Sequence, residues 1–217
     1  MNYLAICQRV NDVVGFQGQV SSVSTDGYQA VLTSAVKDAY EDIQRYRKDW
    51  DWLRGTKVVN VASGTEEYTL AALWGSGTPD LAEYKYITYT DSQGKVHILL
   101  HYSYDSVQLL DTPNASEPRW YTTDPVTNAL IVNPLDGNYS LKIYYTKTLH
   151  QLTANTSTPL IPDRHHQLIV YGAIMKLSTY VGNPTLYDTY ALKYAEELGQ
   201  LMRERNPVKT IRKRPIA

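Results

Sequence analysis

The order of apolar and polar residues predicts helices near the start of the chain. Residues 2–14 and about 27–53 place apolar side chains at three- and four-residue steps, which is the spacing of one face of an α-helix. Gly15 and Gly55 follow these segments, and glycine commonly occupies the position where a helix ends. We therefore expect a short helix followed by a helix about 40 Å long.

The longer predicted helix has an apolar face and a charged face. Thr25 or Asp26 is placed to cap its first turn by accepting backbone N–H bonds. The charged face carries acidic and basic side chains at helical spacing, which suits ion pairs between neighbouring copies of a chain. The candidates for a subunit interface on this helix are Lys37, Glu41 and Arg45.

Between residues 56 and 152 the pattern changes to the two-residue alternation of β-strands. Residues 83–89 and 96–102 alternate most clearly, and residues 91–94 between them predict a hairpin turn. Residues 134–138 predict a second hairpin between the two strand-like segments that flank them. We expect about six short antiparallel strands in a small sandwich or barrel-like module.

Helical periodicity returns in the last third of the chain. Asp163 is placed to cap a helix over residues 164–181, whose centre is apolar almost all round and so predicts burial on most sides. Residues 182–184, Gly-Asn-Pro, end this helix and precede a last helix over about 185–205. Its apolar stripe supplies three more candidates for a subunit interface, Tyr187, Tyr190 and Tyr194.

The predicted fold class is α+β, with a β module inserted into a helical unit. Residues 1–55 supply two N-terminal helices, and residues 56–152 form the antiparallel β module. Residues 153–205 form an antiparallel helical hairpin that completes a four-helix unit. The insertion follows because no helix by itself has a partner for its apolar stripe. Residues 206–217 are expected to form an extended C-terminal arm.

The arm combines cationic residues and two prolines with no carboxylate, and it has no pattern that could bury itself. Three interpretations are open: docking on a protein partner, a disordered solubilising end, and binding to nucleic acid. Apolar residues such as Val208 and Ile211 among the cations favour docking, because apolar side chains contribute little on a phosphate backbone.

Composition narrows the class of protein further. The 217 residues carry a formal net charge of −1, so no overall field attracts nucleic acid or a membrane. The 19 tyrosines against one phenylalanine suit either half-buried contact surfaces or strands of high β propensity. The single Cys7 allows neither a disulfide within the chain nor a cysteine zinc site. No signal-peptide pattern opens the chain, and the longest apolar run, 168–175, is too short for a membrane span.

No constellation for catalysis or for a cofactor emerges from the sequence. His165 and His166 are adjacent, so they would point about 100° apart on a helix, whereas helical metal sites use four-residue spacing. His97 and His101 lie on one predicted strand, about 13 Å apart, which is too far for a shared metal ion. We therefore expect no enzyme activity, no metal and no cofactor.

Four features together resemble the head-to-tail adaptor (connector) proteins of tailed bacteriophages, also called gatekeepers or tail tubular proteins. An aromatic cluster, Asp-Trp-Asp-Trp-Leu-Arg at residues 49–54, follows the long helix, and a β insertion comes next. Residues 161–173 begin Ile-Pro-Asp-Arg-His-His and resemble the pattern at the third helix of that family. The break at residues 182–184 then precedes a helix with Tyr190, Tyr194, Glu196 and Glu197. The resemblance covers nearly the whole chain.

This resemblance implies a structural protein of the virion, assembled in the host cytoplasm as a ring of about twelve copies beneath the portal vertex. Genomic DNA would pass through the lumen without sequence recognition. The β module would face the next tail component (nozzle, stopper or tail tube), with Trp74 and Trp120 as tail-side candidates. The arm would bind the portal protein through Pro207, Val208, Lys209, Ile211, Arg212, Lys213, Arg214, Pro215 and Ile216.

Two other classes remain open. Trp74 and Trp120, within a tyrosine-rich β insertion, are also candidate stacking platforms of a carbohydrate- or cell-surface-binding module. An accessory role in cell-wall hydrolysis is the second, although no residues of the chain support such catalysis.

Overall fold

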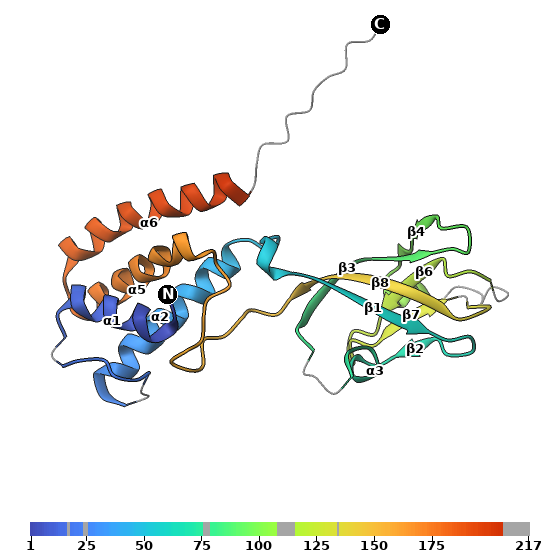
Figure 1. Ribbon diagram of the computed structural model, residues 1–217, viewed down its shortest axis with the longest axis horizontal. Helices are drawn as coiled ribbons and strands as arrows, with labels where there is room; N and C mark the ends of the chain where they lie inside the picture. Colours follow the sequence, from blue (N-terminus) through green and yellow to red (C-terminus); the bar gives the residue numbers. More distant parts are fainter. Residues whose placement is uncertain (17, 24–25, 76–78, 108–115, 134, 206–217) are drawn as a thin grey trace, which may run out of the picture. The chain divides into compact units, whose positions relative to one another are not determined.

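The computed structural model describes residues 1–16, 18–23, 26–75, 79–107, 116–133 and 135–205, and it is mixed α+β (Figure 1). The chain divides into two compact units. One unit combines the residues before Leu53 with those after Thr148, and the other spans Leu53–Thr148. We call them the helical unit and the β unit.

Helix α5 (His166–Tyr180) is the centre of the helical unit. It contacts α1 (Tyr3–Val14), α2 (Gly27–Tyr46) and α6 (Pro184–Arg205) (Figure 1). Its side chains are apolar nearly all round, and nine of its fifteen residues are buried, as the sequence predicts for a helix covered on most sides.

The first helix begins and ends where the sequence predicts. The Asn2 side chain accepts a hydrogen bond from the backbone N–H of Ala5 at 2.9 Å, which satisfies one of the free donors of the first turn. Gly15 adopts φ 77° and donates its N–H to the carbonyl of Asn11 at 2.9 Å. A residue with a Cβ is strained at that φ, so glycine fits this end of the helix.

The second helix is shorter than predicted, because it ends at Tyr46 rather than near Leu53. Arg47 is extended, and the chain turns so that the Trp50 indole donates to the carbonyl of Ile43 at 2.9 Å. This bond satisfies a carbonyl of the last turn, which has no partner within the helix. Trp50 is therefore buried by a fold-back of the chain, although its spacing had placed it on the apolar stripe.

Two predicted helix boundaries also change. Asp163 does not cap a helix from residue 164, because it begins a 3-10 turn, Asp163–His165, and α5 starts at His166. Gly55 does not terminate α2, because it lies within strand β1 (Arg54–Val61). An added Cβ at Gly55 would collide with the ring of Tyr145, so this glycine allows a close approach of an aromatic ring.

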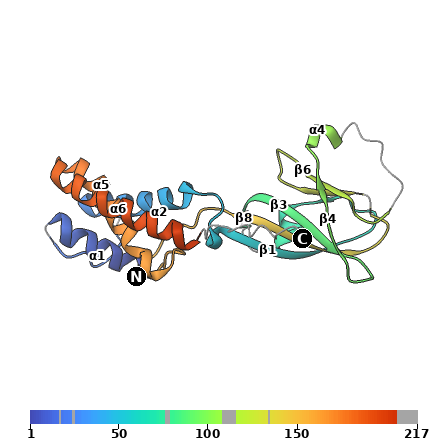
Figure 2. The same ribbon diagram turned by 90° about the horizontal axis from the view of Figure 1, so that it is seen from above.

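The β unit consists of two four-stranded sheets, whose strands lie side by side in Figures 1 and 2. The first has the order β1-β8-β3-β4, in which β8 is Tyr139–Lys147, β3 is Leu81–Thr90 and β4 is Val96–Ile98. The second has the order β2-β7-β6-β5, made of Glu67–Tyr68, Leu130–Asn133, Trp120–Thr123 and Leu100–His101. Two short helices, α3 (Leu70–Trp74) and α4 (Tyr104–Val107), accompany them. Ile87, Leu130, Val132, Leu141 and Ile143 are among the core residues.

The hairpin predicted at residues 91–94 is confirmed, because β3 and β4 pair antiparallel around it. The second predicted hairpin is wrong, because β7 and β8 belong to different sheets. The predicted strand 96–102 is divided: the buried Leu99 separates β4 from β5, which puts His97 and His101 in different sheets. The module is also not wholly antiparallel, since β5 and β6 pair parallel.

Candidate functional site

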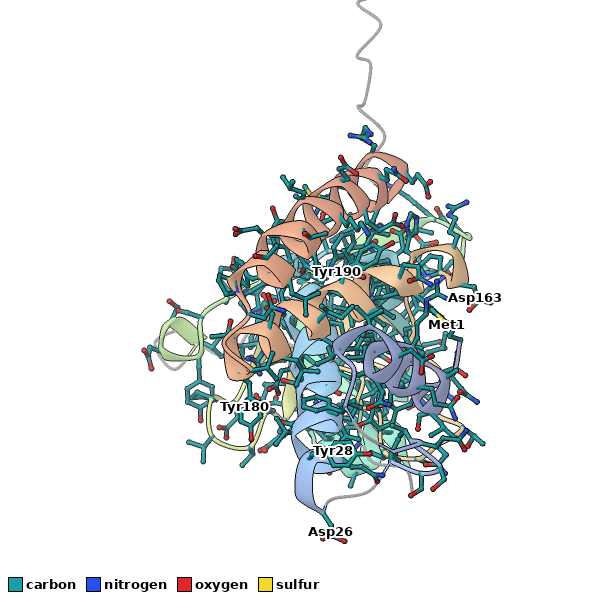
Figure 3. The ribbon with its side chains drawn as sticks, turned by 90° about the vertical axis from the view of Figure 1, so that its left-hand side faces the viewer. Met1, Asp26, Tyr28, Asp163, Tyr180 and Tyr190 are labelled. Carbon is teal, nitrogen blue, oxygen red and sulfur yellow. The ribbon has the colours of Figure 1, made fainter. Side chains whose placement is uncertain are left out.

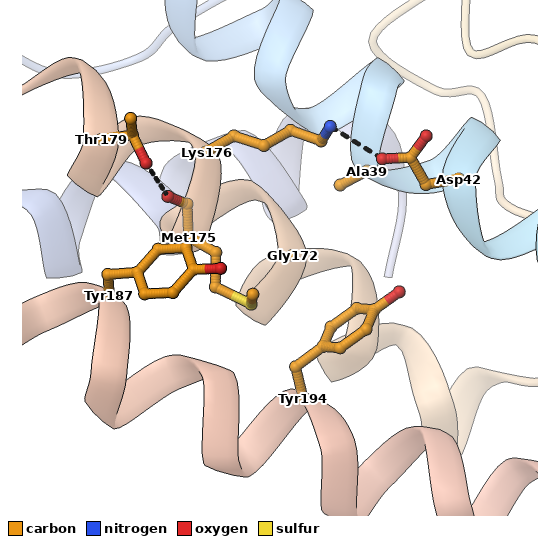
Figure 4. A pocket seen from close by; sticks show the side chains of 8 residues that line it. All are labelled: Ala39, Asp42, Gly172, Met175, Lys176, Thr179, Tyr187 and Tyr194. Carbon is orange, nitrogen blue, oxygen red and sulfur yellow. Dashed lines mark hydrogen bonds and ion pairs between the residues drawn. The ribbon is translucent and has the colours of Figure 1, made fainter.

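A groove lies between α6, α5 and α2 in the helical unit (Figure 4). Its volume is about 290 Å³. It is lined by Ala39 and Asp42 of α2, by Gly172, Met175, Lys176 and Thr179 of α5, and by Tyr187 and Tyr194 of α6. Apolar carbon and aromatic rings therefore dominate the groove, with one ion pair at its wall.

Gly172 sets how closely the three helices approach. A Cβ at this position would lie 3.1 Å from Cβ of Ala39 and 3.2 Å from Cε2 of Tyr194, which is tighter than ordinary carbon contacts. The sequence carries a signal for this contact, because a glycine inside an otherwise apolar helix often has a packing reason such as the close approach of another element.

The N-terminal half of α6 is covered least. Among its described side chains, only Leu198 and Leu201 are buried, and both belong to the C-terminal half. Tyr187 is 41% exposed and Leu192 is 71% exposed. The half of α6 that borders the groove therefore presents two apolar side chains that the described residues leave exposed.

The predicted tyrosine stripe of α6 lies at the groove and beside α5. Tyr190 lies at the seam between α5 and α6, with its ring 5.7 Å from that of Tyr171 and the ammonium of Lys193 4.7 Å from its centre (Figure 3). Tyr194 points into the groove (Figure 4). Burial, together with the neighbouring Asp42, raises the pKa of the Tyr194 phenol, so its hydroxyl stays neutral.

The wall of the groove carries an ion pair that the sequence had not singled out. Nζ of Lys176 on α5 lies 2.7 Å from a carboxylate oxygen of Asp42 on α2 (Figure 4). Both side chains are partly exposed, so the pair contributes about 0–1 kcal/mol and mainly orients the two helices.

The charged candidates on α2 already have partners within the chain. Lys37 lies over the buried ring of Tyr3, 5.9 Å from its centre. Glu41 accepts hydrogen bonds from Arg45 at 3.0 Å and from Gln151 at 2.8 Å. None of these three candidates lines the groove, whereas their neighbour Asp42 does.

His165 holds the C-terminal half of α6. Its side chain is 3% exposed, with Nδ1 2.6 Å from Glu197 and Nε2 2.9 Å from Glu204. Arg164 pairs with Glu204 as well. His165 therefore ties the turn before α5 to α6. The described residues contain no group of three side chains that could hold a metal ion.

The neighbouring His166 faces another direction. It is fully buried, and its Nε2 lies 2.8 Å from the carbonyl oxygen of Ile161. Burial lowers the pKa of its imidazole, so the neutral form is favoured.

The tryptophan candidates of the β unit belong to its internal packing. Trp120 is 8% exposed and meets Tyr102 edge to face at 6.2 Å. Trp74 packs edge-on against Tyr145 at 5.4 Å. Trp120 is thus buried, whereas Trp74 is half-buried against the core of the β unit. The candidate portal-binding arm, residues 206–217, lies outside the described residues.

Tyr187 and Leu192 remain exposed on the half of α6 that borders the groove, and exposed apolar side chains of this kind suit contact with another chain. The chain matches the SU10 adaptor protein family over residues 1–212. A match over nearly the whole length shows that the chain belongs to this family, and the resemblance to phage head-to-tail adaptors is confirmed. It is thus a structural adaptor of a phage, located in the virion.

The curated proteins contain no match to the chain. Along the described ranges of the sequence, no helix combines the length and apolarity that a membrane crossing requires.

Proposed function

We propose that this adaptor assembles into a closed ring of about twelve copies that joins the portal vertex to the next tail component. Genomic DNA passes through the lumen of the ring, and the role is non-enzymatic. The observation that carries the proposal is the partly exposed N-terminal half of α6, in a chain whose family consists of adaptors. Tyr187 and Leu192, which the described residues leave exposed on this half, suit a contact with a neighbouring copy.

The charge of the chain supports passage rather than capture of DNA. The formal net charge is −1, so the wall of such a ring carries no strong positive field. Proteins that hold DNA neutralise its phosphates with many lysine and arginine side chains. A nearly neutral wall lets the duplex slide.

We propose a division of labour along the chain. Residues 1–55 and 153–205 form one four-helix domain that builds the ring, and residues 56–152 form a module directed at the tail component. The grouping of the described residues into a helical unit and a β unit supports this division. Residues 206–217 form the arm that docks on the portal protein.

The arm is tested by deletion. A chain lacking residues 206–217 should keep its circular dichroism and melting temperature but fail to join portal rings in electron micrographs of the mixed proteins. As a matched control, Lys209, Arg212, Lys213 and Arg214 are replaced by glutamine while the apolar residues of the arm are kept. Docking through apolar contacts predicts that this variant still joins the portal with reduced salt dependence.

Two outcomes count against the arm assignment. Portal joining by the truncated chain at wild-type concentrations contradicts it directly. If the glutamine variant fails to join the portal and the wild-type chain binds DNA in a salt-sensitive way that the variant does not, the arm is a nucleic-acid contact instead.

A further inference from the structure

The β unit carries an exposed apolar edge where the chain passes from one sheet to the other. Val96 and Ile98 of β4 are 62% and 68% exposed, and Leu100 of β5 is 61% exposed. Among the described strands, β4 has a neighbour on one side only, because it is the last strand of the order β1-β8-β3-β4. Exposed apolar side chains on an open strand edge form a template for pairing with another strand.

The other edge of the same sheet is open as well. Strand β1, Arg54–Val61, is the first strand in the order, and its eight residues pair with β8 in one unbroken register. It contains no proline and no bulge, two of the devices that prevent pairing at an edge. Val58, in the middle of β1, is 60% exposed.

The register places the exposed residues of both edges in one row. Val58 of β1 lies opposite Lys142 of β8, Lys142 lies opposite Thr88 of β3, and Thr88 lies opposite Ile98 of β4. Residues directly opposite one another point to the same face of a sheet. Val58 and Ile98 therefore mark the two ends of the same row on the same face.

The strand directions of the two edges also match. Each neighbouring pair in the order β1-β8-β3-β4 is antiparallel, so β4 runs opposite to β1. If a second copy continues the sheet beyond β4 with its own β1, the new pair is again antiparallel. In that register Ile98 of one copy lies beside Val58 of the next, an apolar cross-strand pair of the kind that stabilises sheets.

We propose that β4 of one copy pairs with β1 of the next copy, so that the sheet continues from subunit to subunit. The partner is a second copy of this chain, because the two open edges complement each other in direction, register and apolar character. The contact joins two different surfaces of the subunit, so it propagates from copy to copy, and it forms a ring when the rotation between copies closes. The inference rests on the proposed ring and identifies one of its interfaces.

Lys57 and Arg54 are the charged residues of β1, and an edge charge discourages indiscriminate pairing. Lys57 lies opposite Ile143, on the face away from Val58. Lys57 therefore does not occupy the row of Val58, which can pair with β4 of the next copy.

Cross-linking tests the pairing. The double variant Val58→Cys/Ile98→Cys is assembled with portal protein and treated with a short bismaleimide. The wild-type Cys7 is fully buried and contributes no exposed thiol. We expect a ladder of covalent multimers on a denaturing gel, because each boundary contributes one thiol from either side. The matched control Val58→Cys/Val126→Cys uses the 87% exposed Val126 between β6 and β7 and should give no ladder.

A second measurement uses charge instead of thiols. Ile98→Lys should raise the concentration at the midpoint of assembly at least tenfold, whereas Val126→Lys should leave it unchanged. Both side chains are exposed in the subunit, so both variants should keep the wild-type melting temperature.

The outcomes separate this inference from the ring itself. Rings in micrographs, without a ladder of covalent multimers from the double variant, would support the proposed ring and show that the edge pairing is wrong. A ladder without closed rings would support the pairing and contradict the proposed ring. Cross-links from either single variant alone, or cross-links to a tail component in place of a second copy, would overturn the pairing. Failure of wild-type and variant chains to associate at all would overturn both.

Discussion

Nδ1 of His165 lies 2.6 Å from Oε1 of Glu197, and this contact fastens the last helix to the turn that precedes α5. The imidazole is almost completely buried. Glu197→Ala leaves a buried ring nitrogen without this partner, which should cost about 1–3 kcal/mol of unfolding free energy. Urea titration followed by circular dichroism measures the change.

The neighbouring residue supplies the control for that contact. Glu196 is exposed, so Glu196→Ala should change the unfolding free energy by less than about 0.5 kcal/mol. Equal losses of unfolding free energy in the two variants would show that the Glu197 carboxylate affects only the helix itself and not the contact with His165.

Two glycines of the helical unit should respond to alanine in opposite directions. At Gly172 the new Cβ would press on Ala39 and Tyr194, so Gly172→Ala should destabilise the unit by about 1–3 kcal/mol. At Gly199, on α6, the new Cβ would meet only the end of the Arg203 side chain at 3.6 Å. Gly199→Ala should stabilise by about 0.5–1 kcal/mol through helix propensity. Thermal melting of both variants checks the pair, and stabilisation by Gly172→Ala would show that α6 is free to shift.

Trp50 and Trp52 stack at 4.5 Å but differ in their polar contacts. The Trp50 indole donates to Ile43, whereas the buried indole N–H of Trp52 has no hydrogen-bond acceptor among the described residues. Trp50→Phe should therefore cost more unfolding free energy than Trp52→Phe, by about 1 kcal/mol or more. A larger loss for Trp52→Phe would contradict the fold-back of the chain onto α2.

The stability of the helical unit should fall at mildly acidic pH. Burial holds the pKa of His166 below its ordinary value of 6.5, so the unfolded chain binds a proton at a pH where the folded chain does not. The stability that comes from keeping His166 neutral is fully present above pH 6.5. It is lost as the pH falls from that value toward the pKa of His166 in the folded chain, by up to about 1.4 kcal/mol per pH unit.

Denaturant titrations at about pH 7.5 and about pH 5.5 measure this loss. His166→Gln should flatten the pH dependence even if it lowers the stability at neutral pH. His101→Asn, at an exposed position of β5, should leave the dependence unchanged. The same slope in wild type and His166→Gln would assign the pH dependence to another group.

Local patterns predicted the elements whose ends are set by their own residues. Asn2 and Gly15 delimit α1 through hydrogen bonds within four residues, and the sequence alone located both. The apolar centre of α5 predicted its burial for the same reason, since periodicity reports which faces must leave water. The turn at residues 91–94 also acts locally.

Long-range contacts decided the rest. The spacing of Trp50 fitted a continuing helix, but the chain turns after Tyr46 and the Trp50 indole donates a hydrogen bond to the carbonyl of Ile43. The strands flanking residues 134–138 fitted a hairpin, yet β7 pairs instead with the preceding β6 and the distant β2, and β8 pairs with the distant β1 and β3. Pairing across a sheet depends on which surfaces meet, and alternation along one strand carries no information about that choice.

The sequence by itself determined that the chain is α+β, that α5 is a buried helix and that the family is one of phage adaptors. It could do so because propensity, periodicity and motif order are properties of neighbouring residues. Only the tertiary structure decided that Tyr187 and Leu192 of α6 stay exposed, and that Val58 and Ile98 end one row at the two edges of a sheet of described strands. These features depend on the distances between packed helices and strands. Contacts between residues remote in the chain, such as those at Gly172 and His165, set these distances.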